Sequence, residues 1–361
     1  MRARWFVFSG LGLAIGVAVA CGSGAPPAGG NDGLPNALAG PFRVLRKPQE
    51  GASAPFVIGG SLSYRDPSAL DLDGDPATLG VAVYLEAGEN GFPHTIYRYA
   101  LPDGPARAAK TGTGTKVLSA DQPWEGTTLA RPFALRVGAE IWLYYEAAGC
   151  IGRAISSDGL TFSKPDPGPA LCGDPATWEG GAIGAPSVHQ ARDGSFRLFY
   201  GAAGSIGEAR SSDGVAFTRV STSPVLGPRA PLLAAVSDGG IDDPFDDATV
   251  DDPDTMIAMT SDGKPLTYLY YTGANRLGQH AIGLAARFGD DGPFDPNPQP
   301  VLSRYDCHGP SVVRNGPLTV LYVGGRSNEA SMTWTPSILA GVAPATGGLP
   351  SLPDAGTDAG P

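Results

Sequence analysis

The chain has a deficit of basic residues, few cysteines and no Cys-x-x-Cys pair. It contains 25 Lys and Arg against 36 Asp and Glu, which leaves a net charge of −11. Because nucleic-acid phosphates need surfaces rich in Lys and Arg, this balance argues against a nucleic-acid partner. The missing Cys-x-x-Cys pair argues in the same way against a zinc site built from thiolates.

Glycine and proline are abundant, with 52 and 35 residues among 361. They lie between short alternating runs of Val, Leu, Tyr and Phe, a pattern typical of an all-β protein with many turns. The apolar share of 42% is enough for a large core.

The N-terminus has the features of an export signal. Arg2 and Arg4 precede an apolar run over 5–19, which is short for a membrane span. We therefore expect a signal peptide over 1–20.

The run A-V-A-C (18–21) resembles the lipobox of bacterial lipoproteins, which implies acylation of Cys21. The protein would then be anchored to a bacterial membrane by this lipid only, with 21–40 as a flexible tether. Gly22 favours the outer membrane if the host is Gram-negative. A plain secretory signal is the alternative.

The stretch from Trp124 to Phe217 contains one unit written twice. W-E-G-T-T-L-A-R-P (124–132) returns as W-E-G-G-A-I-G-A-P (178–186), at an offset of 54 to 55 residues that holds for the strands that follow. Self-similarity at a fixed period indicates a repeat architecture.

The parts of this unit recur along the chain. An X-Pro segment followed by apolar residues occurs at 66–70, 131–135, 185–189, 252–256 and 309–313. An aromatic-aliphatic strand follows each of them, at 81–85, 141–145, 196–200, 266–271 and 318–323. Third strands are expected at 95–99, 151–155, 206–210, 280–284 and 331–334, and short fourth strands at 116–118, 169–171, 224–226, 300–302 and, ahead of the first repeat, 42–45.

These spacings predict an all-β, five-bladed β-propeller over 41–340, in which the N-terminal strand closes the last blade and leaves no open sheet edge. The tail 341–361 has almost nothing to bury and is expected to be disordered. We expect a monomer.

Three cysteines remain if Cys21 carries lipid. Cys150 and Cys172 lie 22 residues apart in one repeat, and an exported protein keeps disulfides, so a bridge between them is one of two alternatives. Cys307 would then be an odd thiol, expected to be buried and inert.

The first strand of each propeller blade lines the central channel, where sites usually form. The residues that start the X-Pro segments are Asp66, Arg131, Ala185, Asp252 and Gly309, with Arg65, Asp251 and His308 beside them. We expect them to face a shared pocket; the alternative is that Asp-Pro is only a common turn dipeptide.

Inner strands of the form D-P-S and A-P-S-V, Tyr-rich second strands and S-S-D-G-x-x-F turns resemble the five-bladed glycosidases of families 43, 32 and 68. The resemblance implies an Asp on blade one as base or nucleophile, a second Asp on blade two and a Glu acid on blade three. Asp66 matches the first, whereas Arg131 and Ala185 stand where the others are expected. His308 lies near the position where some members place a His beside a metal ion.

A rearranged catalytic set would combine Asp66 with Asp252 or Glu179. Glu179 and Glu125 belong to the two W-E-G segments, and their repetition indicates a structural role first.

The acidic loop 237–254 is a second candidate site. Its carboxylates, among them Asp242, Asp243, Asp246 and Asp247, are the hard oxygen ligands that Ca²⁺ prefers, although the EF-hand spacing is missing. A solvated acidic loop is the alternative.

Three functions stay open at this point. The first is a lipid-anchored propeller that binds a glycan or oligosaccharide without cleaving it. The second is an active glycoside hydrolase on arabinan, xylan or fructan with rearranged carboxylates, and the third is an interaction or structural propeller without a sugar site.

Overall fold

The computed structural model describes residues 42–44, 63–73, 80–89, 92–102, 114–191, 193–230, 244–259, 264–303, 306–315, 318–326 and 336–344. The chain divides into two compact units, 1–34 and 35–361, and every described residue belongs to the second. The described residues form strands and turns without a helix, and so none of them forms a helix that could span a membrane. The predicted signal peptide, the tether and Cys21 lie outside the described residues, as do residues 345–361 of the predicted tail 341–361, whereas 341–344 belong to a strand.

Within the described residues, the strands form five four-stranded antiparallel sheets. Sheet 1 contains β2 (Ser63–Asp71), β3 (Val81–Gly88), β4 (Thr95–Leu101) and β5 (Thr115–Leu118). Sheet 2 contains β6 (Ala130–Val137), β7 (Glu140–Ala147), β8 (Cys150–Ser156) and β9 (Leu171–Cys172). Sheet 3 contains β10 (Gly184–Gln190), β11 (Phe196–Ala202), β12 (Ser205–Ser211) and β13 (Thr218–Arg219).

The two remaining sheets follow the same plan with one change. Sheet 4 contains β14 (Thr249–Met259), β15 (Pro265–Ala274), β16 (His280–Phe288) and β17 (Asp295–Pro296). Sheet 5 contains β18 (His308–Asn315), β19 (Leu318–Arg326), β20 (Pro336–Pro344) and β1 (Arg43–Val44). Its outer strand thus comes from the other end of the sequence, with Arg43 opposite Val342.

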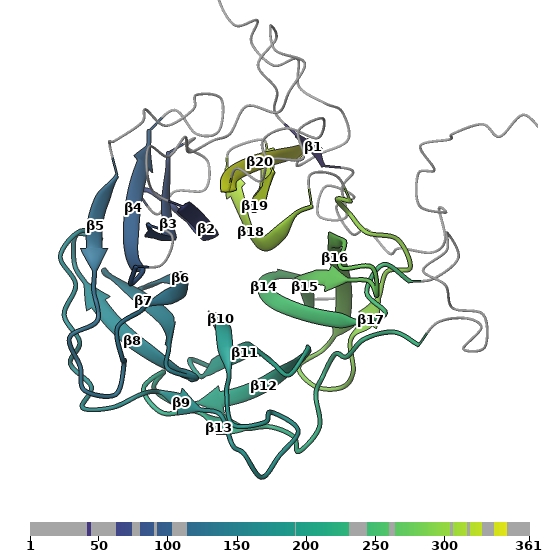
Figure 1. The fold of residues 1–361 in the computed structure, drawn as a ribbon, viewed down its shortest axis with the longest axis horizontal. Coiled ribbons are helices and arrows are strands. Elements are labelled where there is room, and N and C mark those ends of the chain that lie inside the picture. The colour runs from purple at the N-terminus through teal and green to yellow at the C-terminus, as the bar shows by residue number, and fades with distance from the viewer. Residues whose placement is uncertain are drawn as a thin grey trace, which may run out of the picture. The chain divides into compact units, whose positions relative to one another are not determined.

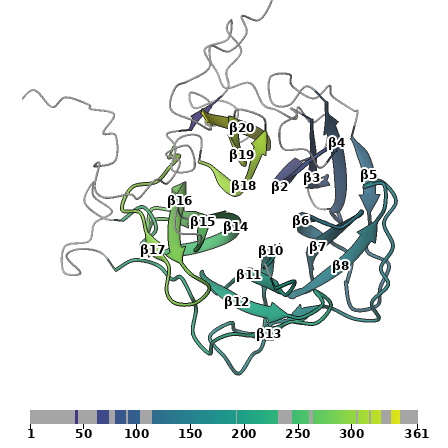
Figure 2. The same ribbon diagram turned by 180° about the vertical axis from the view of Figure 1, so that it is seen from behind.

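The sheets are arranged radially, and their first strands β2, β6, β10, β14 and β18 surround the centre (Figure 1). Each first strand contacts the first strand of the next sheet, and β18 contacts β2. The same order is seen from behind (Figure 2). The architecture is an all-β propeller.

The core lies between neighbouring sheets, which explains why the second strands are apolar on both faces. All eight residues of β3 are buried, as are all seven of β11. Tyr144 on β7 packs in one cluster with Val188 and Leu198 of the next sheet. A strand covered on both faces needs continuous apolar residues rather than alternation.

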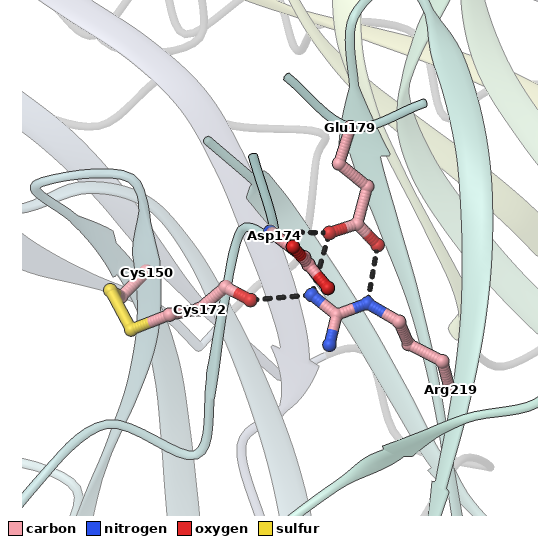
Figure 3. The surroundings of a disulfide bond; sticks show 5 residues. All are labelled: Cys150, Cys172, Asp174, Glu179 and Arg219. Carbon is pink, nitrogen blue, oxygen red and sulfur yellow. Dashed lines mark hydrogen bonds and ion pairs between the residues drawn. A yellow bond between two sulfur atoms is a disulfide. The ribbon is translucent and has the colours of Figure 1, made fainter. Parts of the chain in front are cut away.

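Cys150 and Cys172 stand directly opposite each other on β8 and β9 and are joined by a disulfide, with their Cα atoms 4.0 Å apart (Figure 3). The bridge therefore holds the two-residue outer strand β9 onto its sheet. Cys307 is buried and forms no disulfide within the described residues.

Removing this bridge should lower the free energy of unfolding by about 3 kcal/mol, because a closed loop of this length constrains the unfolded chain. We expect this loss in the C150S/C172S double variant, measured by urea unfolding. Wild type unfolded in reductant serves as the control and should match the double variant. Equal midpoints for oxidised wild type and the double variant would show that the bridge adds no stability.

Candidate functional site

Each first strand makes the same irregular step where it reaches the channel. The register with the second strand shifts at Arg65/Ser68, Ala130/Phe133, Gly184/Ser187, Asp251/Asp254 and His308/Ser311. These are β-bulges, which re-aim side chains and often adjoin active sites. The X residue of every X-Pro segment lies in such a bulge.

The X residues share an unusual backbone conformation. Their φ angles are positive: 46° at Asp66, 44° at Arg131, 46° at Ala185, 48° at Asp252 and 57° at Gly309. A positive φ is uncommon for residues other than glycine and costs about 1–2 kcal/mol, so neighbouring groups must hold it in place. Backbone strain of this kind clusters at functional sites.

The bulges are held by hydrogen bonds between neighbouring sheets. Glu86 Oε2 at the end of β3 accepts the Arg131 N–H at 3.4 Å, and Glu146 Oε2 on β7 accepts the Ala185 N–H at 3.3 Å. Thr272 Oγ1 on β15 accepts the Gly309 N–H at 2.9 Å. The second strand of one sheet thus fixes the X residue of the next.

Sheet 3 has glycine, Gly201, at the position that Glu86, Glu146 and Thr272 occupy elsewhere. Asp251 fills the space: a Cβ on Gly201 would lie 1.7 Å from Asp251 Oδ1, and this oxygen accepts the Asp252 N–H at 2.9 Å. The carboxylate of Asp251 therefore replaces the missing side chain of the preceding sheet.

A second set of bonds lies one step further along four of the five first strands. Ser68 Oγ accepts the Ala134 N–H, Ser187 Oγ the Thr255 N–H, and Ser311 Oγ the Ala69 N–H, at 2.8, 3.1 and 2.9 Å. This explains why serine follows proline in three of the five X-Pro segments. In sheet 4 the buried Asp254 takes the serine position and accepts the Val312 N–H.

The X-Pro segments line a central cavity of about 30 Å³. All five prolines contribute to its wall, together with Asp66, Arg131, Ala185, Asp252 and Gly309. The volume suffices for two or three water molecules, at about 10–15 Å³ each. A sugar ring is larger and would have to lie at the mouth of the cavity.

Arg131 is surrounded by three carboxylates from two strands, β7 and β14. Its Nη1 lies 3.3 Å from Asp251 Oδ2 and 3.5 Å from Glu146 Oε2, and its Nε lies 3.5 Å from Asp252 Oδ1. These charges, that of Asp252 foremost, raise the pKa of Arg131 well above its usual value. Asp252 Oδ2 also accepts the hydroxyl of Thr272 at 2.9 Å.

Asp66 lies beside Gly309 of the neighbouring sheet. A Cβ atom on Gly309 would be 2.6 Å from Asp66 Oδ1. Burial, and next the negative charges of Asp252 and Glu86, raise the pKa of Asp66 well above its ordinary value. Burial and Asp252 likewise raise the pKa of Asp251 to about 6. The site thus brings together Asp66, a carboxyl group with a raised pKa, and Asp252, which is paired with Arg131.

Histidines border the same end of the sheets. His94 Nδ1 is bonded to Glu86 Oε1, and His280 Nδ1 lies 2.9 Å from Asp306 Oδ1. The rings of His280 and His308 are 6.4 Å apart, and burial lowers the pKa of His308. The ring of His308 covers Gly324 of β19: a Cβ atom on Gly324 would lie 2.7 Å from His308 Nε2.

Six of the predicted pocket residues therefore meet at the cavity or its charge cluster: Asp66, Arg131, Ala185, Asp251, Asp252 and Gly309. Arg65 does not, because its side chain is exposed and forms no part of the cavity wall. Sequence reasoning missed Glu86 and Glu146. Their signal was available in Y-L-E (84–86) and Y-Y-E (144–146), which end equivalent second strands.

The structure does not place Glu179 in the wall of the central cavity. Its carboxylate accepts the Tyr200 hydroxyl at 2.6 Å and two bonds from Arg219, which also donates to the carbonyl of Cys172 beside the disulfide (Figure 3). Its side chain is fully buried. Glu179 is a structural residue.

The same clamp occurs three times. Glu125 accepts the Tyr145 hydroxyl at 2.5 Å and pairs with Lys164, and Asp246 accepts the Tyr271 hydroxyl at 2.7 Å and pairs with Arg229. Each tyrosine also stacks on the aromatic residue before the acid: Trp124, Trp178 or Phe245.

This third clamp bears on the predicted calcium loop. Asp246 is paired with Arg229 and accepts the Tyr271 hydroxyl. The buried Asp247 has its Oδ2 3.1 Å from Arg276 Nε. Asp242 and Asp243 lie outside the described residues. No cluster of three or more metal-binding side chains occurs in the described part of the chain.

Comparison with known proteins places the fold. No protein-family model and no curated protein sequence matches the chain. Among solved structures, the catalytic domain of the family 62 α-L-arabinofuranosidase of Coprinopsis cinerea matches with a TM-score of 0.56 at 13% identity, covering 84% of this chain and 97% of that one. In fold, the chain is similar to the β-propeller glycosidases.

Two further structures agree with this likeness. The family 43 enzyme of Xanthomonas citri, complexed with xylotriose, has a TM-score of 0.51 at 18% identity and covers 81% of this chain and 89% of that one. The β-1,2-mannobiose phosphorylase of Listeria innocua has a TM-score of 0.56 at 13% identity, with 83% and 93% covered. At these identities the likeness concerns the fold alone.

Asp254 provides a test of the charge environment at the cavity. Burial raises its pKa to about 7. A carboxyl group with a raised pKa in the folded state stabilises the fold below pH 4 and loses this contribution as the pH rises towards 7. The D254N variant should therefore gain up to about 4 kcal/mol of unfolding free energy relative to wild type between pH 4 and 7.

Urea unfolding at several pH values measures this difference. D295N is the control, because Asp295 is an exposed carboxylate on β17. A constant offset between D254N and wild type across the pH range would contradict the raised pKa of Asp254.

Proposed function

We propose that the protein is an exported carbohydrate-binding propeller that holds a saccharide at the mouth of its central cavity. The supporting observation is the convergence of Asp66, Arg131 and Asp252 on a proline-lined cavity, from three sheets that are distant in the sequence. Carboxylates accept and guanidinium groups donate the hydrogen bonds of sugar hydroxyls. A few convergent polar groups over an apolar wall are typical of ligand sites.

The composition of the site favours binding over cleavage. Glycoside hydrolysis needs an acid and a base or nucleophile on either side of the scissile bond. The X residue of sheet 3 is Ala185, which cannot act as an acid. Asp251, Asp252 and Glu146 are each paired with Arg131. Structures of this fold bound to xylotriose or cellotriose support a saccharide as ligand by analogy.

The proposal includes the way in which the scaffold is closed and anchored. Pairing of β1 with β20 and contact between β18 and β2 support a closed ring of five blades. The motif at 18–21 supports acylation of Cys21 and attachment to a bacterial membrane, with the propeller as a monomer on its tether.

Calorimetric titration with xylose, xylotriose, cellotriose and arabino-oligosaccharides tests the binding proposal. The E146Q variant should weaken binding about tenfold, because Glu146 contacts both Arg131 and the Ala185 N–H. E140Q is the matched control, since Glu140 lies on the same strand β7 at the opposite end and is exposed. Equal affinity of E146Q and wild type, or no binding to any saccharide, would contradict the proposed site.

Hydrolysis is the second candidate, and the raised pKa of Asp66 favours it. A carboxyl group with a raised pKa is better suited to protonate the leaving oxygen than one with an ordinary pKa, and Asp252 would activate water. Both residues line the same cavity.

We expect any release of nitrophenol from nitrophenyl arabinoside, xyloside or fructoside to fall at least a hundredfold in D66N, with E140Q unchanged. Activity that survives in D66N would exclude Asp66 as the acid. Saccharide binding without release in wild type would favour the binding protein.

A further inference from the structure

Two large apolar side chains are strongly exposed on hairpins at the cavity end of the sheets. Phe92, in the turn between β3 and β4, is 64% exposed, and Leu277, between β15 and β16, is 61% exposed. Both hairpins follow the strand ends that carry Glu86 and Thr272. Exposed aromatic residues beside a polar site are typical of ligand-binding surfaces.

The hairpin of Phe92 is connected to the site by a chain of contacts. Two residues after Phe92, His94 is bonded through Nδ1 to Glu86, whose other oxygen accepts the Arg131 N–H. The carbonyl of His94 accepts the Leu129 N–H of the next sheet at 3.1 Å. Phe92 therefore stands on a turn that is held against the rim of the cavity, and its N–H is bonded to the Glu89 carbonyl at 3.0 Å.

We infer that Phe92 forms an outer saccharide subsite, on which a sugar ring stacks while the neighbouring unit of the same chain occupies the cavity mouth. This inference rests on the proposed binding function. The faces of sugar rings carry C–H groups, which pack well against the negative face of an aromatic ring. The cavity is too small for a ring, so a longer saccharide must be held by groups outside it. Phe92 supplies such a group and makes the protein selective for oligosaccharides over monosaccharides.

The test compares xylotriose with xylose, by calorimetry, on the folded chain. F92A should bind the trimer about tenfold more weakly, equivalent to about 1.4 kcal/mol, and the monosaccharide with unchanged affinity. F92W should bind the trimer at least as well as wild type, since it keeps an aromatic face. Arabinotriose and cellotriose, each with its monosaccharide, follow in the same design.

F288A is the matched control. Phe288 is also 64% exposed, but it ends β16 opposite Leu266, at the far end of sheet 4 from the cavity. Trimer affinity that is unchanged in F92A, or lowered equally in F92A and F288A, would overturn the subsite while leaving the binding function intact. A wild-type protein that binds none of the saccharides would overturn both.

Discussion

The structure depends on the positive φ of the residue before each inner proline. This conformation turns the chain into the channel, but it costs free energy at the four positions where the residue is not glycine. The compensation comes from the neighbouring sheet, because Glu86, Glu146 and Thr272 each accept the N–H of an X residue one sheet further on. The site is consequently a property of the ring of sheets and does not belong to any one of them.

The same hydrogen bonds explain why the site holds more acidic than basic side chains. Glu86 and Glu146 are required as acceptors for backbone N–H groups, and Asp251 replaces the acceptor that Gly201 lacks. Positioning therefore leaves an excess of carboxylates around one cation, Arg131. Burial first, and then this excess of negative charge, raises the pKa values of Asp66 and Asp251, and the pocket chemistry follows from how the bulges are held.

Sequence reasoning located the X residues because the X-Pro pattern is local and repeats in phase with the strands. It missed Glu86 and Glu146, since equivalent strands carry glycine or threonine at that position and the repeat does not stand out. It left the role of Glu179 open, because the partners of this side chain, Tyr200 and Arg219, lie 21 and 40 residues away. The sequence order does not reveal toward which side of a sheet such an acid points.

The bonds that hold Arg131, Ala185, Asp252 and Gly309 use the backbone N–H of X and a side-chain oxygen of another residue, so they do not depend on the identity of the X side chain. This independence allows Asp, Arg, Ala, Asp and Gly to occupy five equivalent positions of one ring. It also explains why a likeness in fold to glycosidases leaves the chemistry open: exchanging an acid for arginine or alanine at X changes the pocket without disturbing the scaffold. Function in such a propeller must therefore be determined from the X residues and their immediate partners.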